Sequence, residues 1–417
     1  MANPKEWGSI RELYRIGYGP SSSHTMGPRR AAEIFRRRTP DAPGYRVTLY
    51  GSLAAVGRGH LTDRVIAEAL APASCEIVWD EDAPYRHPNA VRFEALDRGG
   101  TVRESWVAFS VGGGRLEDEG GPIPDGPEVS YPVGNITDCL RWCQAQRKPF
   151  WALAAECEPG LWDYLAEVWR VMEGALRRGL ESEQCLLPGG LDVPRKAESA
   201  YARAQNLGGV MREQSLISAY ALAVAEENAS GGLVVTAPTC GSAGILPAIL
   251  HYFSTSQDAS EQQVLRGLAT AALFGMSVKA NASISGAEVG CQGEVGTACA
   301  MAAAAATQLL GGSPAQIEYA AEMALEHHLG LTCDPVMGLV QVPCIERNAI
   351  AAMRALACAT YALLSDGRHI IPFDVVVEVM YETGRDLQSA YRETAAGGLA
   401  EVWRRRREQM QRGGPAD

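Results

Sequence analysis

Three cysteines in the second half of the chain stand where helices are expected to break. Cys291 follows a glycine, Cys333 is followed two positions later by a proline, and Cys344 directly follows a proline. Glycine and proline favour turns with exposed backbone N–H groups, so three loops can bring the three thiols to one point. Three thiolates would suit an iron–sulfur cluster whose fourth iron is open for chemistry.

The same three residues also fit a simpler interpretation. Cysteine is among the residue types that are most often fully buried. The spacings of 42 residues (291 to 333) and 11 residues (333 to 344) match no compact ligand motif. Residue types and spacing alone therefore leave open whether these thiols bind a metal or fill a core.

Long runs of sequence surround these cysteines. Residues 279–294 read Lys-Ala-Asn-Ala-Ser-Ile-Ser-Gly-Ala-Glu-Val-Gly-Cys-Gln-Gly-Glu, residues 331–336 read Leu-Thr-Cys-Asp-Pro-Val, and residues 341–348 read Gln-Val-Pro-Cys-Ile-Glu-Arg-Asn. Together they resemble the catalytic half of the iron–sulfur L-serine dehydratases, also called L-serine ammonia-lyases. The resemblance implies that Cys291, Cys333 and Cys344 each hold one iron of a [4Fe–4S] cluster and that the fourth iron takes substrate. It also implies that Ser285 contacts the substrate carboxylate.

A hydroxyl-rich loop near the N-terminus, Pro20-Ser-Ser-Ser-His-Thr, leads into a predicted helix. Free N–H groups and the helix dipole favour a carboxylate at such a position, although a plain N-cap with spare serines is the simpler interpretation. The surrounding run, residues 19–32, also resembles the family. On that basis the predicted grip on the substrate carboxylate consists of Ser22, Ser23, His24 and Thr25.

Two further histidines lie in turn-like sequence. His60 stands between a glycine and Leu61-Thr-Asp63, and His87 precedes Pro88-Asn89. A lone histidine is more often a structural hydrogen-bonding residue, but imidazole can also take a proton near neutral pH. Because both lie in family-like motifs, each is a candidate catalytic base. Both belong to the first domain, so the site is expected between the domains, where ligand pockets often form.

The resemblance covers nearly the whole chain and indicates a fusion of two halves that in this family occur as one chain or as two subunits. It also suggests a homodimer. One position departs from the pattern, because many relatives carry asparagine where Cys240 stands, and its role as ligand, substrate contact or filler stays open. Cys299 and Cys358 are expected in the core. Cys139 and Cys143 have helical spacing but no partner motif.

The fold class expected is α+β. Residues 1–134 should form an α/β domain with a small sheet, ending in a Pro- and Gly-rich linker at about 115–134, and residues 135–417 an all-helical domain that carries the cluster. Alternating patterns predict strands at 45–50, 75–79, 91–96 and 105–111. Helices are predicted at 27–38, 63–71, 161–178, 215–227, 261–274, 295–310, 314–329, 348–364 and 373–383.

The composition limits which binding partners and which cellular compartment are expected. The chain has 417 residues, a net charge of −11 and a pI near 5.3, which argues against nucleic acid as a partner. Eleven cysteines and an N-terminus without an apolar core favour the reducing cytoplasm over secretion. Residues 228–257 carry no charged side chain, but their prolines and glycines favour buried turns and a helix over a membrane span.

Pyridoxal phosphate is a second cofactor to consider, because Gly112-Gly-Gly could form a phosphate nest. A pyridoxal enzyme needs a lysine near that loop. The chain has only Lys5, Lys148, Lys196 and Lys279, and none stands in sequence typical of pyridoxal enzymes. The cluster is therefore the preferred cofactor.

The reaction that the resemblance implies is the conversion of L-serine to pyruvate and ammonia. A Lewis-acid iron would help a poor hydroxyl leaving group to depart and an α-hydrogen to ionise. A related lyase acting on L-threonine or L-cysteine stays open, as does an amino-acid-binding regulatory protein without turnover, although such a binder has no use for an open iron.

The resting state of the open iron can also be considered from the sequence. Some single-chain relatives end in a cysteine able to reach the cluster, whereas residues 411–417 here contain no thiol. Water or a small anion is therefore expected on the open iron at rest, and the tail is expected to be disordered.

Overall fold

The computed structural model describes residues 7–82, 84–124, 126–393 and 397–411. The tail considered above lies outside these residues from position 412 onward. The chain forms two compact units, one made of residues 17–125 and a larger one made of the residues before 17 and after 125.

The smaller unit is built on a six-stranded sheet whose strand order is β3-β2-β4-β5-β6-β7. Strands β2 and β3 are parallel, and the other neighbouring pairs are antiparallel. The strands are β2 (Gly44–Tyr50), β3 (Ser74–Asp80), β4 (Ala90–Leu96), β5 (Val102–Ser110), β6 (Leu116–Asp118) and β7 (Gly121–Pro122). Two helices, α2 (Ser52–Val56) and α3 (Thr62–Leu70), form the crossover between the parallel strands.

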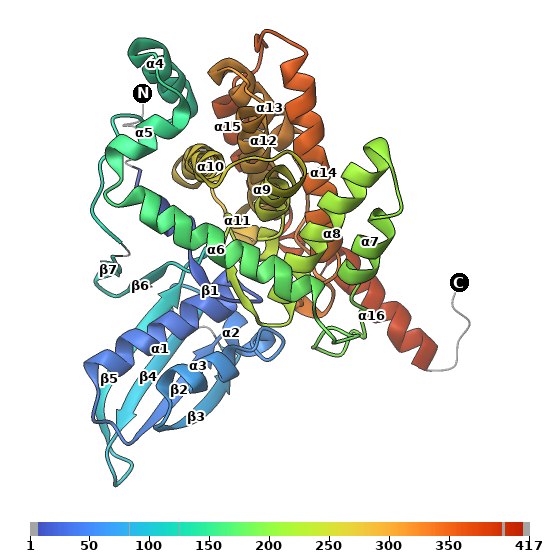
Figure 1. The fold of residues 1–417 in the computed structure, drawn as a ribbon. Coiled ribbons are helices and arrows are strands. Elements are labelled where there is room, and N and C mark those ends of the chain that lie inside the picture. The colour runs from blue at the N-terminus through green and yellow to red at the C-terminus, as the bar shows by residue number, and fades with distance from the viewer. Residues whose placement is uncertain (1–6, 83, 125, 394–396, 412–417) are drawn as a thin grey trace. The chain divides into compact units, whose positions relative to one another are not determined.

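Helices α1 (Gly27–Arg38) and α3 lie side by side over the sheet (Figure 1). Phe35 of α1 is buried against Phe93 of β4 and Trp106 of β5, with ring centroids 5.5 Å and 6.3 Å apart. Val47 and Leu49 alternate along β2 and join the same core. This period of two is the pattern that predicted the strands, and all of the predicted ones are present.

The segment expected to be a linker begins inside this sheet. Residues 116–118 and 121–122 form a tight antiparallel pair at its edge, because proline and glycine are compatible with a short edge strand and its turn. At the other end, residues 7–16 belong to the larger unit. Trp7 Nε1 donates a 3.1 Å hydrogen bond to the carbonyl of Gly134. The boundary expected at residue 134 was meant to separate the two halves known from the family, and its position stays a prediction.

The larger unit is mostly helical, so the predicted fold class is confirmed. Its helices are α4 (Ile136–Gln146), α5 (Phe150–Cys157), α6 (Leu161–Leu180), α7 (Ala197–Ala204), α8 (Gly209–Ala229), α9 (Ile245–Ser256), α10 (Glu261–Asn281), α11 (Gly286–Val289), α12 (Thr297–Leu309), α13 (Pro314–Glu326), α14 (Cys344–Leu363), α15 (Phe373–Asp386) and α16 (Gly398–Gln411). One short strand, β8 (Leu233–Val235), departs from the all-helical expectation.

Helix α12 is the centre of this unit. It packs against α9, α10, α13 and α14 (Figure 1), and residues 298–306 have no exposed surface. Most of these residues are alanine, whose small side chain lets neighbouring helices approach closely. The turn that carries Cys291 leads into this buried alanine-rich helix, and α13 and α14, which adjoin the segments of Cys333 and Cys344, pack against it.

The uncharged stretch, residues 228–257, contains β8 and α9 and is mostly buried. With 12 residues, α9 spans about 18 Å, well short of a bilayer core. In the part of the chain that the structure describes, no helix combines the length and apolar character needed to cross a membrane.

Candidate metal centre and histidine cluster

Three thiols of the larger unit come from three different segments. Cys291 precedes the π-helical turn Gln292–Gly296, which leads into α12. Cys333 lies after α13 and forms an isolated β-bridge with Arg392, and Cys344 is the first residue of α14. Only 3%, 3% and 8% of their respective surfaces are exposed. Each thiol thus lies in a turn or at a helix start, where its neighbouring glycine or proline interrupts regular structure.

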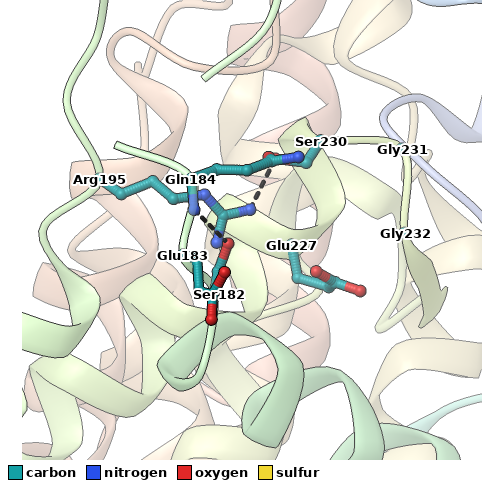
Figure 2. Close-up of a pocket in the computed structure, with 8 residues that line it drawn as sticks. All are labelled: Ser182, Glu183, Gln184, Arg195, Glu227, Ser230, Gly231 and Gly232. Carbon is teal, nitrogen blue, oxygen red and sulfur yellow. Dashed lines mark hydrogen bonds between the residues drawn. The ribbon is translucent and has the colours of Figure 1, made fainter. Parts of the chain in front are cut away.

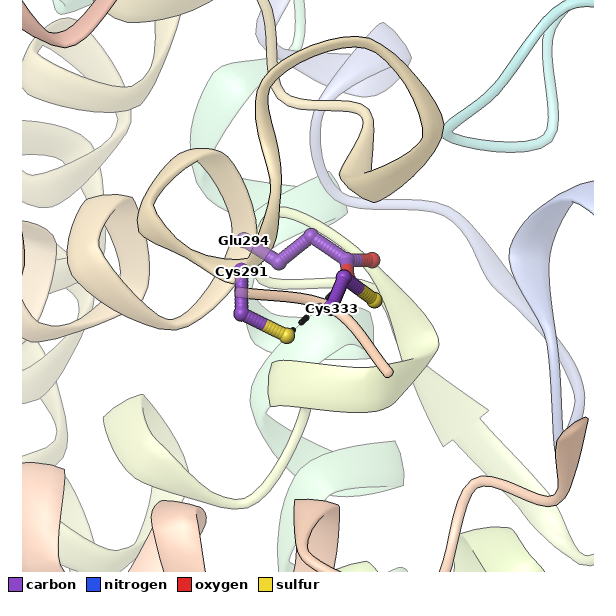
Figure 3. A group of neighbouring side chains, drawn as sticks. All are labelled: Cys291, Glu294 and Cys333. Atoms are coloured by element: carbon purple, nitrogen blue, oxygen red, sulfur yellow. Dashed lines mark hydrogen bonds between the residues drawn. The ribbon is translucent and has the colours of Figure 1, made fainter. Parts of the chain in front are cut away.

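Glu294 lies between two of these thiols (Figure 3). Its Oε2 is 3.8 Å from Cys291 Sγ and 3.9 Å from Cys333 Sγ. One ligand atom from each of the three residues lies within 4.8 Å of the others, a spacing that a metal ion could bridge. Glu294 belongs to one of the family-like runs, but the sequence alone gave it no role.

The thiols are held in surroundings that disfavour the free thiolate. The pKa of Cys333 lies well above its usual value because of its interaction with Cys291 and its burial. Burial, together with Cys291 nearby, also raises the pKa of Cys344 well above its usual value. Since a bound cation stabilises the thiolate, these positions suit thiols that bind metal better than thiolates left free.

The guanidinium of Arg347 offsets the negative charge that the thiolates and Glu294 would bring to this centre. Arg347 lies one helical turn after Cys344. Burial alone would lower the pKa of Arg347, but Cys291 and Cys344 beside it raise it. Its Nη1 donates a 2.7 Å hydrogen bond to the carbonyl of Thr332, next to the third thiol. Both missed residues, Glu294 and Arg347, stand three positions after a cysteine, a spacing that places side chains on one helical face.

The backbone around the thiols is fixed by two buried amides. Asn348 Nδ2 donates to the carbonyls of Cys344 (2.8 Å) and Gly241 (2.7 Å), and its Oδ1 accepts from the N–H of Gly244 (2.9 Å). Gln292 Oε1 accepts from the N–H of Gly330 at 2.9 Å. These bonds tie the start of α14 to residues 241–244, and the turn before α12 to the end of α13.

Two glycines border the Glu294 carboxylate. A Cβ on Gly286 would lie 2.7 Å from Glu294 Oε2 and 3.0 Å from Cys333 Sγ, whereas a Cβ on Gly241 would meet nothing closer than 3.7 Å. Ser285, the predicted carboxylate contact, precedes Gly286 and caps α11. Three buried thiols with a neighbouring cation fit the chemistry of an iron–sulfur cluster.

Among the other cysteines, Cys299 and Cys358 are buried as expected, whereas the role of Cys240 stays open. Cys299 is buried in α12 and donates a 3.2 Å hydrogen bond to the carbonyl of Ala351, and Cys358 is buried in α14. Cys240 is buried, and its pKa is raised first by burial and then by Glu294 nearby. It therefore neighbours the candidate metal centre without being in the closest group of ligand atoms.

In the smaller unit, His24 is held by serines on both ring nitrogens. Nδ1 lies 2.9 Å from the Ser23 hydroxyl, and Nε2 lies 2.9 Å from the Ser52 hydroxyl. The backbone follows from the sequence, since Ser21 caps the π-helical turn Ser22–Met26 by accepting from the N–H of His24. Ser52 received no role from the sequence, because only the fold brings it to His24.

His60 lies next to this histidine, with ring centroids 4.7 Å apart. Burial lowers the pKa of His60 to about 4, so its imidazole is neutral near pH 7. Its Nδ1 is buried, and an interaction with the backbone of Val56, one turn earlier in the chain, partly opposes this lowering of the pKa. Thr25 donates a 2.7 Å hydrogen bond to the carbonyl of His60, which gives Thr25 a structural use.

His87 is the third histidine of this group. Burial lowers the pKa of His24 well below its usual value, and both His60 and His87 add to the effect by proximity. His87 Nδ1 accepts a 3.0 Å hydrogen bond from the N–H of Asn89. The smaller unit thus brings both predicted bases close to the serine-rich turn.

A separate pocket of about 530 Å³ in the larger unit is lined by Arg195, Glu227, Ser230 and neighbouring residues (Figure 2). Arg195 Nη2 donates to the Ser230 hydroxyl at 2.7 Å, and Glu227 pairs with Arg178 at 2.6 Å. None of the predicted site residues lines it. The adjacent Glu226 accepts a 2.7 Å hydrogen bond from the N–H of Lys196 and so anchors the start of α7.

The chain matches two family models. The model described as serine dehydratase beta chain matches residues 9–80, and the one described as serine dehydratase alpha chain matches residues 94–400. The L-serine dehydratase of Streptomyces coelicolor is 42% identical over 94% of this chain and 98% of its own length. With the same coverage, L-serine dehydratase 2 of Escherichia coli is 41% identical and the L-serine dehydratase of Haemophilus influenzae 39% identical. The chain therefore belongs to the serine dehydratase family, with the beta-type and alpha-type regions fused in one polypeptide.

Proposed function

We propose that this protein is an L-serine ammonia-lyase that converts L-serine to pyruvate and ammonia and holds a [4Fe–4S] cluster on Cys291, Cys333 and Cys344. The observation that carries the proposal is the convergence of three buried thiols from three segments. Relatives about 40% identical over 94% of the chain, each named an L-serine dehydratase, support the substrate.

The cluster, when bound, would supply a Lewis acid that activates the β-hydroxyl of serine as a leaving group. The chain's own residues shape the surrounding site. Arg347 offsets the negative charge of the thiolates, Asn348 fixes the start of α14, and Gly286 leaves room beside Cys333. Ser285, at the start of α11, offers its hydroxyl to the substrate carboxylate.

The proton chemistry is assigned to the smaller unit. His60 is neutral near pH 7 and lies against His24 of the serine-rich turn, so it is the preferred acceptor of the α-proton, with His87 as the second candidate. Ser22 and Ser23 would bind the substrate carboxylate, whereas His24 is already engaged on both nitrogens and positions its neighbours. Loss of the α-proton and the hydroxyl as water leaves aminoacrylate, which tautomerises and hydrolyses to pyruvate and ammonia.

The test is anaerobic purification followed by an optical spectrum, iron and sulfide counts, and a pyruvate assay with L-serine. The expected result is about four irons and four sulfides per chain with serine-dependent pyruvate formation. Protein that turns over serine without iron would contradict the role of the cluster. Serine binding without turnover would favour the amino-acid-binding alternative.

The same assay separates related lyases. A site that closes around the β-hydroxyl leaves little space for the extra methyl of threonine, and a methyl-sized misfit is worth about 1–3 kcal/mol. Serine should therefore have the higher kcat/KM. Equal values for the two substrates would exclude this steric selection, and a preference for L-cysteine would identify a different lyase.

We also infer a homodimer that works in the reducing cytoplasm. Family membership supports the first, and the buried thiols, which need a reducing environment to bind iron, support the second. Light scattering of the anaerobic protein should give twice the mass of the 44.6 kDa chain.

A further inference from the structure

The candidate metal centre offers a fourth donor besides the three thiols. Glu294 shares the closest group of ligand atoms with Cys291 and Cys333, and its carboxylate points between their sulfurs (Figure 3). Within the described residues, no other carboxylate joins that group. Three thiolates and one carboxylate would supply one donor for each iron of a four-iron cluster.

The chemistry of this fourth donor differs from that of the other three. Thiolates bind iron–sulfur clusters tightly, whereas a carboxylate oxygen is a harder ligand that is exchanged more readily. A cluster iron held by a carboxylate would be protected at rest and still open to displacement by substrate oxygens. A fourth thiolate would close that position.

The neighbours of Glu294 hold its carboxylate more closely on one side than on the other. The hydroxyl of Thr239 and the thiol of Cys291 donate hydrogen bonds to it, and Arg347 lies close by. Gly286 packs tightly against Oε2, but on the Oε1 side a Cβ on Gly241 would still be 3.8 Å away. The side chain is therefore packed more tightly toward Gly286 than toward Gly241.

Two neighbours fit the role less well. The Glu393 carboxylate is near enough to raise the pKa of Cys333 and Cys344, but it accepts a hydrogen bond from the backbone N–H of Ala287 and does not join the closest group of ligand atoms. Cys240 and Cys344 both lie outside the closest group of ligand atoms, but Cys344 interacts with Cys291, whereas the pKa of Cys240 is raised by burial and by Glu294 alone. Glu294 stands three residues after Cys291 on the same turn, so its carboxylate lies within 4 Å of both Cys291 Sγ and Cys333 Sγ.

We propose that the Glu294 carboxylate binds the fourth iron in the resting enzyme, in place of the water or small anion expected from the sequence, and that L-serine displaces it. This inference rests on the proposed function, because it requires the cluster on the three cysteines.

The test uses the purified anaerobic protein with ⁵⁷Fe introduced at the labile iron, studied by Mössbauer spectroscopy with and without L-serine. Glu294→Gln keeps the size of the side chain but removes the carboxylate. Its matched control is Glu288→Gln, which changes an exposed carboxyl of α11. In the absence of serine, the labile-iron signal of Glu294→Gln should differ from wild type, and that of Glu288→Gln should not.

Two further readouts sharpen the result. With saturating serine, wild type and Glu294→Gln should give the same labile-iron signal, because the carboxylate has then left the iron. During mild oxidation, the EPR signal of the three-iron form should appear about tenfold faster in Glu294→Gln, since loss of a supporting group commonly weakens metal binding by 10–100-fold.

Identical labile-iron signals in wild type and Glu294→Gln without serine, together with equal rates of iron loss, would overturn the inference. If Glu294→Gln assembles no cluster, Glu294→Asp decides: an altered labile-iron signal supports ligation, and an unchanged one overturns it. Wild-type protein that contains no iron and sulfide would overturn the cluster itself and therefore the proposed function as well.

Discussion

The hydroxyl of Ser52 lies 2.9 Å from Nε2 of His24, while Ser23 occupies Nδ1 of the same ring. Because neutral imidazole carries one N–H, one serine must donate to the ring and the other must accept from it. Ser52 therefore helps to fix the His24 tautomer and, through ring contact, the orientation of His60.

Removal of this hydroxyl should lower activity without affecting iron. Ser52→Ala is expected to reduce kcat/KM for L-serine about tenfold, at the low end of effects on proton transfer, with an unchanged cluster spectrum. Ser52→Thr keeps the hydroxyl and should recover part of the loss. Ser74→Ala, on the exposed end of β3, is the control. Wild-type kinetics and an unshifted pH profile in Ser52→Ala would refute the positioning role.

The pH dependence of kcat/KM should reflect the burial of His60. Burial penalises imidazolium and lowers the pKa of His60 to about 4, so the basic form is present throughout pH 5–8. Protonation of His60 should therefore cause no loss of kcat/KM near pH 6.5. A pH–rate profile from pH 5 to 8 checks this, and an acid limb near 6.5 that disappears in His60→Asn would contradict it.

The two candidate bases can be separated by substitution. His60→Asn should lower kcat by about 100-fold or more, as expected for loss of a general base, while iron and sulfide counts stay at the wild-type level. His87→Asn should have the smaller effect, because the Nδ1 of His87 already accepts a backbone hydrogen bond. The reverse order of effects would assign the base to His87.

Each of the three ligand cysteines should be needed for the cluster. Cys291→Ser, Cys333→Ser and Cys344→Ser should lose the cluster absorbance, because a hydroxyl is a far poorer ligand for iron–sulfur clusters than a thiolate. Cys299→Ser and Cys358→Ser should retain full iron and sulfide counts. Retention of the cluster and of wild-type turnover in all three ligand variants, assembled anaerobically, would remove the assignment.

A single methyl group at Gly286 should disturb the centre. The added Cβ would lie 2.7 Å from Glu294 Oε2 and 3.0 Å from Cys333 Sγ, closer than ordinary contacts allow. Gly286→Ala should therefore lower the iron content and turnover at least severalfold. Gly208→Ala is the matched control, because a Cβ there meets nothing within 4 Å. Equal iron content in the two variants would show that the centre tolerates the methyl.

Regular elements could be predicted from the sequence because their signals are local. Helix α10 begins at the predicted Glu261, since Ser260 and Gln263 form a capping box within four residues of chain. The same helix continues seven residues beyond the predicted end at Phe274, to Asn281, because buried neighbours stabilise a stretch whose sequence alone gives no clear stop.

The assignments that the sequence could not provide depend on distant partners. Ser52 meets His24 across 28 positions, and Glu158 accepts a 2.7 Å hydrogen bond from the N–H of Ile10 across 148 positions, which attaches the first residues to the larger unit. No pattern within a window of residues reports such pairs. Glu294, by contrast, was within reach of the sequence, because its three-residue spacing from Cys291 is a helical signal.

The packing of α12 also determines where the protein can adapt when its cofactor is inserted. Cys291 is connected through a short turn to a helix whose alanines allow no inward shift, and Cys344 starts α14, which packs against that helix. Densely packed interiors have low compressibility. Cys333, by contrast, lies on an irregular segment held by backbone bonds to residues 391–393. When the cluster is inserted, the Cys333 segment should therefore move the most, while Cys291 and Cys344 should keep their positions.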